Sequence, residues 1–191
     1  MERERAILDA AAELFYRSGF HGVGMDAIGD RAGLSGPAIY RTFSGKDEIL
    51  AALLHETLDH LIASAATASD DPQRDLEDLI RHEIDVTTAN RHLISIYQRE
   101  VRSLVEPWRR QYLRRMRTYA DRWEAVVRRR YPEASPERVV MSVQAVLGLI
   151  HSVTYWPSSV MKSPELSDFV YSLALGSLDA LSDVGVAAAR T

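Results

Sequence analysis

Apolar residues recur at intervals of three and four along nearly the whole sequence, and almost no stretch alternates apolar with polar residues. The first spacing places apolar side chains on one face of a helix, whereas alternation is what a half-buried strand requires. Short breaks such as Gly33–Ser35, Ser69–Pro72 and Tyr131–Pro132 divide the chain into separate helical segments. The pattern therefore predicts an all-α protein built from packed amphipathic helices.

Several segments begin with residues that are typical of helix starts. Ser44-Gly-Lys-Asp47 has the spacing of a capping box, with Asp in place of the usual Glu. Ser135-Pro-Glu137 and Ser163-Pro-Glu165 each offer Ser as the N-cap, Pro as the first helical residue and Glu in the first turn. Gly19 is expected to end the first helix, and Val184 to Thr191 are expected to form a frayed tail.

Composition excludes several classes of site. The 191 residues include no cysteine, which removes disulfide frameworks, zinc fingers and thiol nucleophiles. His55 and His60 stand five residues apart rather than four, and no Glu-x-x-His pair occurs, so we expect no metal and no cofactor. Neither a phosphate-binding glycine loop nor a nucleophile with its base is recognisable, which argues against an enzyme. The charged amino terminus and the early breaks in each apolar run predict a cytoplasmic protein without a membrane segment.

The first 45 residues carry the most informative pattern. Three short helices are predicted there, and a tight glycine turn at Gly33–Ser35 joins the second to the third. This is the helix-turn-helix arrangement, whose second helix enters the major groove of DNA. Ile39 and Phe43, four residues apart, hold that helix from the inside and leave residues 40–42 outward.

The same region resembles the N-terminal signature of the tetracycline-repressor (TetR) family. The residues that carry the resemblance are Ile7-Leu-Asp-Ala-Ala-Ala-Glu-Leu-Phe15, Gly19-Phe20, Ile28, Ala32-Gly-Leu-Ser35, Ile39-Tyr40, Phe43, Lys46 and Leu50. The match covers about the first 50 residues, and beyond it only the helical layout and the length agree.

The resemblance implies a set of DNA contacts. Tyr40 corresponds to the tyrosine of the recognition helix that contacts phosphate, and Lys46 to the lysine that grips the DNA backbone from the next helix. Thr42 replaces a common His or Tyr with a shorter side chain that still reaches toward phosphate. The positions expected to meet base edges are Pro37, Ala38 and Arg41. Residues 1–50 carry six basic and eight acidic side chains, so binding must depend on where these few cations lie.

One helix-turn-helix reads only a half-site, so two copies are expected to bind a palindrome together. The last two long helices, Val139 to Tyr155 and Leu166 to Leu181, are apolar over most of their surface. The resemblance implies that this pair forms the four-helix interface of a homodimer. The alternative is that both helices are simply the core of a monomer.

Trp108, Tyr112, Met116, Tyr119 and Trp123 follow one another at steps of four, four, three and four. Such a stripe is more often core than ligand site, but the resemblance implies a small-molecule pocket in this part of the chain. The stripe favours an apolar or amphipathic effector. The residues expected to line the pocket are Tyr112, Met116, Tyr119, Trp123, His151 and Tyr155.

We therefore expect a helix-turn-helix DNA-binding domain over residues 1–47 and a ligand-binding and dimerisation domain over residues 48–191. The predicted function is that of a homodimeric transcriptional regulator, a repressor that binds a palindromic operator in double-stranded DNA and responds to a small-molecule effector. Two alternatives stay open at this point. One is a helical-bundle enzyme or carrier with a vestigial DNA-binding motif, and the other is a DNA-binding protein without a ligand.

Overall fold

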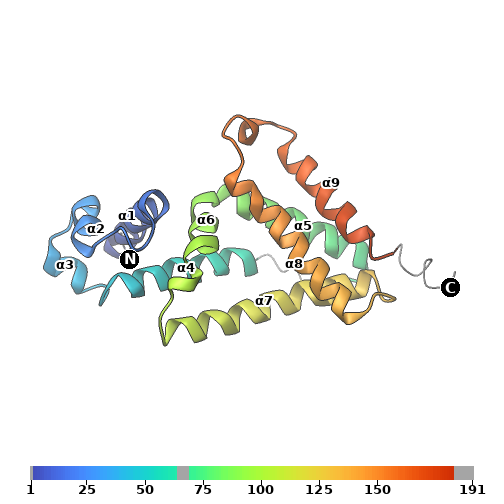
Figure 1. The fold of residues 1–191 in the computed structure, drawn as a ribbon, viewed down its shortest axis with the longest axis horizontal. Coiled ribbons are helices and arrows are strands. Elements are labelled where there is room, and N and C mark those ends of the chain that lie inside the picture. Colours follow the sequence, from blue (N-terminus) through green and yellow to red (C-terminus); the bar gives the residue numbers. More distant parts are fainter. Residues whose placement is uncertain (1, 64–68, 183–191) are drawn as a thin grey trace. The chain divides into compact units, whose positions relative to one another are not determined.

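The computed structural model describes residues 2–63 and 69–182, and within those residues it contains helices and no strand. The prediction of an all-α fold is confirmed. The helices, drawn in Figure 1, are α1 (Glu2–Ser18), α2 (Met25–Ala32), α3 (Gly36–Tyr40), α4 (Lys46–Ile62), α5 (Pro72–Ala89), α6 (Arg91–Glu100), α7 (Trp108–Arg130), α8 (Pro136–Ser152) and α9 (Leu166–Asp179). Short 3-10 turns lie at Val101–Ser103, Val153–Tyr155 and Val160–Lys162.

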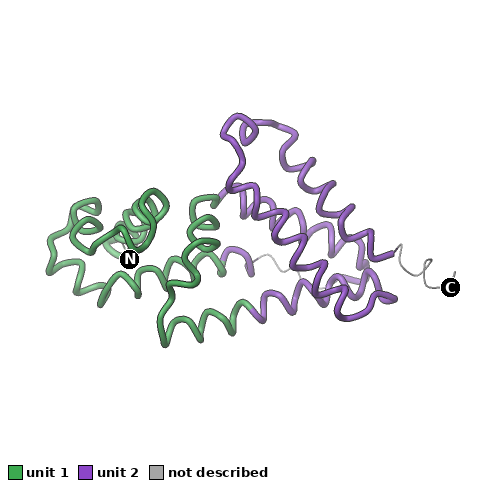
Figure 2. The backbone as a smooth tube through the Cα atoms, viewed as in Figure 1, with its two compact units in different colours: residues 1–59, 90–116 green, residues 60–89, 117–191 purple. Residues whose placement is uncertain are grey.

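The chain forms two compact units, coloured separately in Figure 2. Unit 1 combines the described parts of residues 1–59 with residues 90–116, and unit 2 combines those of 60–89 with those of 117–191. Besides the segment 1–47 that the sequence predicts as the DNA-binding domain, unit 1 includes most of α4, all of α6 and the first turns of α7, and α6 packs on α1. Helices α4 and α7 each begin in unit 1 and continue into unit 2.

Unit 1 is built around the apolar face of α1. Ile7, Ala11 and Phe15 are fully buried on that face, which repeats at steps of four as a helix facing a core does. Gly19 ends α1 with φ of 72°, a conformation that glycine adopts without steric cost. Ile28 of α2 and the leucines of α4 complete this core.

Helix α6 is fastened to the end of α1 by hydrogen bonds to main-chain groups. The Arg99 guanidinium donates to the carbonyl oxygens of Phe15 and Tyr16, at 3.1 and 2.9 Å. The Glu100 carboxylate accepts a hydrogen bond from the backbone N–H of Phe20 at 3.2 Å. The carbonyls at the end of a helix need donors from beyond it. The N–H of Gly19 donates to the Phe15 carbonyl at 3.0 Å, and Arg99 adds its guanidinium to the carbonyls of Phe15 and Tyr16.

Unit 2 is a bundle in which α5, α8 and α9 contact one another. Val143, Val146 and Ile150 of α8 are fully buried, as are Val170 and Leu178 of α9. The Tyr131 hydroxyl donates to Asp179 at 2.7 Å and ties the end of α7 to the end of α9. Burial and this hydrogen bond both raise the pKa of Tyr131.

The helix starts agree with the sequence only in part. Ser135 caps α8 as predicted, accepting a hydrogen bond from the backbone N–H of Arg138 at 3.4 Å. Ser44 is paired with Glu48 rather than with Asp47, because the Glu48 carboxylate accepts from both the backbone N–H and the hydroxyl of Ser44. The predicted start at Ser163 is wrong: a 3-10 turn precedes α9, which begins at Leu166. The predicted tail over residues 184–191 lies outside the described residues.

One helix has the length and composition of a membrane-spanning segment, which does not overturn the prediction that the protein has none. Pro136–Tyr155 form a 20-residue segment with a mean hydropathy of 1.2, which is enough to span a bilayer by length and composition. In the folded protein, 44% of the most apolar 18-residue stretch of this segment is buried. A helix in the core of a globular protein can have the same length and hydropathy. Helix α8 is such a core helix of unit 2, because it packs on α5 and α9.

Candidate functional site

The turn between α2 and α3 sets the direction of the recognition helix. Gly33 has φ of 67°, and its backbone N–H donates to the Asp30 carbonyl at 3.2 Å. The N–H of Leu34 donates to the carbonyl of Gly29 at 2.9 Å. A Cβ atom at Gly29 would lie 3.2 Å from the Leu34 carbonyl oxygen, so this turn is closed around a position with little room for a side chain.

The two faces of α3 and the turn after it differ as the sequence predicts. Ile39 and Phe43 are buried against unit 1. Tyr40 is 55% exposed and Arg41 is exposed as well. Unit 1 therefore presents an aromatic hydroxyl and a guanidinium side by side in the chain on the surface that a helix-turn-helix offers to DNA.

The remaining predicted contact residues differ in their exposure. Pro37 is exposed and Thr42 is half-buried. Ala38 is only 7% exposed, so the structure places it on the packed side of α3 rather than on the outer side.

Lys46 lies at the first residue of α4 and reaches back to the loop between α1 and α2. Its ammonium donates to the carbonyl oxygens of Phe20 and Val23, at 3.1 and 3.0 Å, and lies 4.5 Å from the centre of the Phe20 ring. These bonds use two of the three ammonium protons. A phosphate contact from Lys46 therefore has one proton left to it, and the side chain also braces the start of α4.

The aromatic stripe of α7 is largely buried, but its residues belong to different units. Tyr112 and Met116 are in unit 1, whereas Tyr119 and Trp123 are in unit 2. Tyr112, Tyr119 and Trp123 are buried, and Met116 is half-buried.

Within unit 1, Tyr112 packs against the rings of His55 and Tyr97, with centroids 5.9 and 6.2 Å away. Burial and the nearby Tyr97 raise the pKa of Tyr112. Burial and the adjacent Arg115 lower the pKa of His55, whose Nδ1 lies 3.0 Å from the Arg115 guanidinium. Tyr112 is thus held in an aromatic cluster of unit 1.

Unit 2 buries His151, which the sequence predicts in the effector site, together with two polar side chains that the sequence analysis did not single out, Glu83 and Thr87. Nε2 of His151 in α8 lies 2.7 Å from Oε1 of Glu83 in α5, and both residues are buried. Thr87, one turn after Glu83, is also fully buried. The signal was present, because Glu83 and Thr87 continue the apolar stripe of Leu76 and Ile80 at steps of three and four.

Tyr155 does not join this buried group. It is 58% exposed. Helix α8 ends at Ser152 and a 3-10 turn follows, so the four-residue spacing from His151 no longer places the two side chains on one face. The prediction that Tyr155 lines an interior pocket is therefore not supported by its position.

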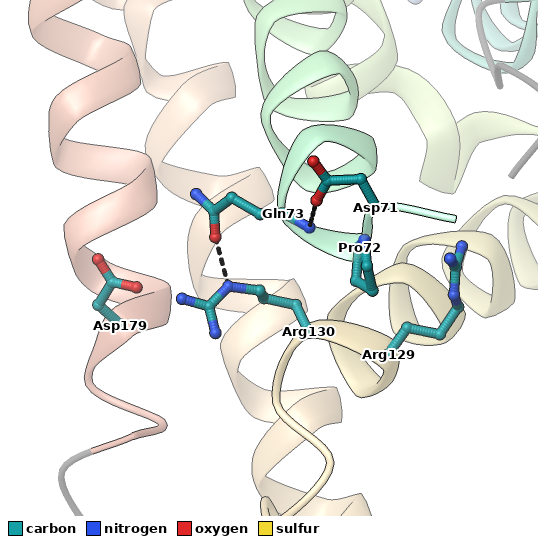
Figure 3. A pocket seen from close by; sticks show the side chains of 6 residues that line it. All are labelled: Asp71, Pro72, Gln73, Arg129, Arg130 and Asp179. Atoms are coloured by element: carbon teal, nitrogen blue, oxygen red, sulfur yellow. Dashed lines mark hydrogen bonds between the residues drawn. The ribbon is translucent and has the colours of Figure 1, made fainter. Parts of the chain in front are cut away.

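One open surface pocket of about 520 Å³ lies in unit 2 and is shown in Figure 3. Its lining residues are Asp71, Pro72, Gln73, Arg129, Arg130 and Asp179. The charged groups are engaged with neighbouring side chains: Arg130 donates to Gln73, and Arg129 donates to Asp75 at 2.6 Å. This polar surface shares no residue with the predicted effector site.

Helices α8 and α9 each keep an apolar face that the protomer does not cover. The exposed side chains are Val140 (39%), Met141 (62%), Phe169 (56%) and Leu173 (42%). Large exposed apolar patches on folded proteins mark interaction sites. No group of three or more His, Asp or Glu residues able to hold a metal ion is found among residues 2–63 and 69–182.

Two family profiles match the chain in succession. The profile described as "Bacterial regulatory proteins, tetR family" matches residues 7–53, and "Tetracyclin repressor-like, C-terminal domain" matches residues 69–178. The chain belongs to the TetR family. Members of this family are transcriptional regulators rather than enzymes, so the helix-turn-helix of α2 and α3 is the DNA-binding element of a regulator.

Named TetR relatives of this chain include an activator and a repressor of transcription. The chain is 42% identical over 77 residues to the HTH-type transcriptional activator FasR of Mycolicibacterium smegmatis, a match covering 38% of this chain and 35% of that protein. It is 29% identical over 129 residues to the HTH-type transcriptional repressor KstR2 of Rhodococcus jostii, covering 65% and 63%. The matches thus span between about a third and just under two thirds of these relatives' lengths.

The TetR fold also relates the chain to solved structures. One is AibR in complex with isovaleryl coenzyme A and operator DNA, with a TM-score of 0.77 and 20% identity. That likeness covers 93% of this chain and 97% of the other. It extends the agreement in fold from the DNA-binding helices through the carboxy-terminal helices.

Proposed function

We propose that this TetR-family protein is a cytoplasmic homodimeric repressor, which binds a palindromic operator and is released from it by a small apolar or amphipathic molecule. The repressor role is supported by KstR2, whose match covers more of this chain than that of the activator FasR. Binding of a small-molecule effector, as distinct from release from DNA, is supported by AibR, whose structure is of a complex with isovaleryl coenzyme A and operator DNA.

In this proposal the exposed end of α3 contacts DNA. Tyr40 donates its hydroxyl proton to phosphate and contributes affinity that does not depend on sequence. Arg41 reads a base edge in the major groove, where guanine offers two acceptors to one guanidinium. Pro37 and Thr42 border this surface, and Lys46 contacts phosphate with its remaining proton.

The exposed apolar face of α8 and α9 is the observation that carries the proposal of a dimer. This face consists of four exposed apolar side chains, Val140, Met141, Phe169 and Leu173. Exposed apolar patches on folded proteins mark sites of protein–protein interaction. A twofold interface would place the same patch of each protomer against its copy. It would also pair two recognition helices at a spacing of about 34 Å or a multiple of it, as a palindrome requires.

An effector acts in this scheme by binding one arrangement of the dimer better than the other. A ligand can shift such an equilibrium only by its differential affinity for the two states. Moving the binding-competent fraction from 99% to 1% needs a difference of about 5.5 kcal/mol. We place the effector among the carboxy-terminal helices, where Tyr119, Trp123 and His151 are buried.

Selection of bound fragments from a random pool of duplex DNA, at a stated salt concentration, tests the proposal. We expect enrichment of a palindrome with half-sites separated by one helical turn or a multiple of it. Weak, salt-sensitive binding without an enriched sequence would refute the operator-binding dimer. The Tyr40→Ala variant is the matched control, since it keeps the fold and removes a phosphate contact.

A further inference from the structure

Unit 2 buries polar atoms that its own side chains leave without partners. Among the described residues, none forms a hydrogen bond with Oε2 of Glu83, the hydroxyl of Thr87 or Nε1 of Trp123. All three residues are fully buried. Glu83 and Thr87 lie one turn apart on the same face of α5, so their side chains are neighbours.

Such atoms are uncommon in folded proteins. More than nine in ten buried polar groups have a hydrogen-bond partner, because an unpaired one loses its hydration without compensation. Glu83 is also fixed in position, since Nε2 of His151 holds its other carboxylate oxygen at 2.7 Å. The free oxygen is therefore presented in one direction, beside a hydroxyl and within an apolar stripe that includes Ile80 and Ile84.

We propose that Glu83 and Thr87 bind a hydroxyl group of the effector, which is an apolar molecule bearing an alcohol. This inference rests on the proposed function, because it specifies the chemistry of the effector that the function requires. An alcohol donates its proton to Oε2 of Glu83 and accepts one from Thr87 in the same position. In this proposal Ile80 and Ile84 of the same stripe contact the apolar part of the molecule.

The set of unpartnered groups favours an alcohol over a cation. An ammonium group has donors only and no acceptor, so it would leave the donor capacity of Thr87 unused. A carboxylate on the effector is also disfavoured, because it has no proton to donate to the Glu83 carboxylate and carries the same charge. A neutral group that both donates and accepts matches the acceptor of Glu83 and the donor of Thr87.

Isomeric pairs of an alcohol and a methyl ether test the inference directly on the full-length protein. The probes are octanol and heptyl methyl ether, cyclohexylmethanol and cyclohexyl methyl ether, and naphthylmethanol and naphthyl methyl ether. Calorimetric titration and the ligand-induced shift in Tm report binding without DNA. In at least one pair we expect the alcohol to bind about tenfold more tightly, the size of one hydrogen bond to a charged acceptor.

Three variants assign the preference to these side chains. Thr87→Val removes the hydroxyl at constant shape and is expected to weaken the binding of alcohol and ether alike, because the oxygen of either probe can accept from Thr87. Glu83→Gln replaces an acceptor with an amide that can donate, and is expected to shift the preference toward the ether. Thr88→Val is the control, because the Thr88 hydroxyl donates to the Ile84 carbonyl within α5, and it should keep the wild-type preference.

The preference for the alcohol decides the outcome. The inference is overturned if no pair shows it in the wild-type protein, whether both probes bind equally or neither binds. It is also overturned if Glu83→Gln keeps the full preference for the alcohol, or if Thr87→Val leaves the affinity for both probes unchanged. Operator selection reports on the proposed function separately, so a protein that enriches a palindrome but shows no alcohol preference contradicts the inference alone.

Discussion

Replacing Phe169 with alanine should separate the proposed dimer into protomers. Phe169 is 56% exposed on α9, which for a side chain of about 200 Å² leaves about 110 Å² of apolar surface for a partner to cover. At about 25 cal/mol per Å² this corresponds to about 2.8 kcal/mol. Alanine retains part of that area, so we expect a loss of about 2 kcal/mol per protomer.

In a twofold-symmetric interface both protomers contribute Phe169, so the dimer loses this free energy twice. The total of about 4 kcal/mol raises the dissociation constant of the dimer about a thousandfold. Sedimentation equilibrium over a range of protein concentrations measures that constant, and operator binding should weaken in parallel. Because Phe169 is exposed in the protomer, its thermal unfolding as a monomer should change little, by about 0.5 kcal/mol at most.

Leu113→Ala is the matched control for this variant. Leu113 is 52% exposed, so it loses a similar kind of apolar surface, but it lies on α7 and outside the α8 and α9 face. It should leave the dissociation constant unchanged. If Phe169→Ala and Leu113→Ala shift the constant equally, or if the wild-type protein is monomeric throughout, the assignment of the interface to α8 and α9 is refuted.

Three further predictions follow from unit 1. Tyr40→Ala should weaken binding to all duplexes by a similar factor, whereas Arg41→Ala should remove about 1–3 kcal/mol of preference at one base pair; identical selected sequences for Arg41→Ala and wild type would remove Arg41 from base recognition. Glu100→Ala leaves the buried N–H of Phe20 without its side-chain acceptor and should lower the free energy of unfolding by about 1–3 kcal/mol in a denaturant titration, so an unchanged midpoint would contradict the role given to Glu100. Because burial and a neighbouring guanidinium lower the pKa of His55 in the fold, the unfolded chain binds more protons below about pH 6.5 and wild-type stability should fall as the pH decreases through that range. His55→Gln should flatten this part of the stability profile, and profiles of equal slope would show that His55 is not responsible.

The amino-terminal helices were predictable because local chemistry determines them. A glycine in the left-handed conformation ends α1, another closes the turn before α3, and the apolar spacing of Ile39 and Phe43 gives the inner face of the recognition helix. Each of these signals lies within a few residues of the element that it controls. None depends on which distant segment packs nearby.

Contacts between distant segments were not predictable in the same way. Glu83 and Thr87 continue the spacing of the apolar stripe, but their polar residue type favours a solvated face, and the packing of α5 against α8 decides that they are buried. The position of Tyr155 was not predictable from helical spacing either. Helix α8 ends three residues before Tyr155, so the spacing from His151 no longer indicates a shared face. The start of α9 at Leu166 was missed because Ser163, the expected N-cap, instead ends the short 3-10 turn that precedes the helix.

The way α6 holds α1 has a consequence for building hybrid regulators. Arg99 and Glu100 bind carbonyl oxygens and an N–H of the main chain, at Phe15, Tyr16 and Phe20, rather than particular side chains. Every polypeptide offers those groups wherever a helix ends in the same geometry. An amino-terminal domain taken from another family member can therefore be grafted onto this carboxy-terminal region and keep its anchorage, provided that its first helix ends at the same length.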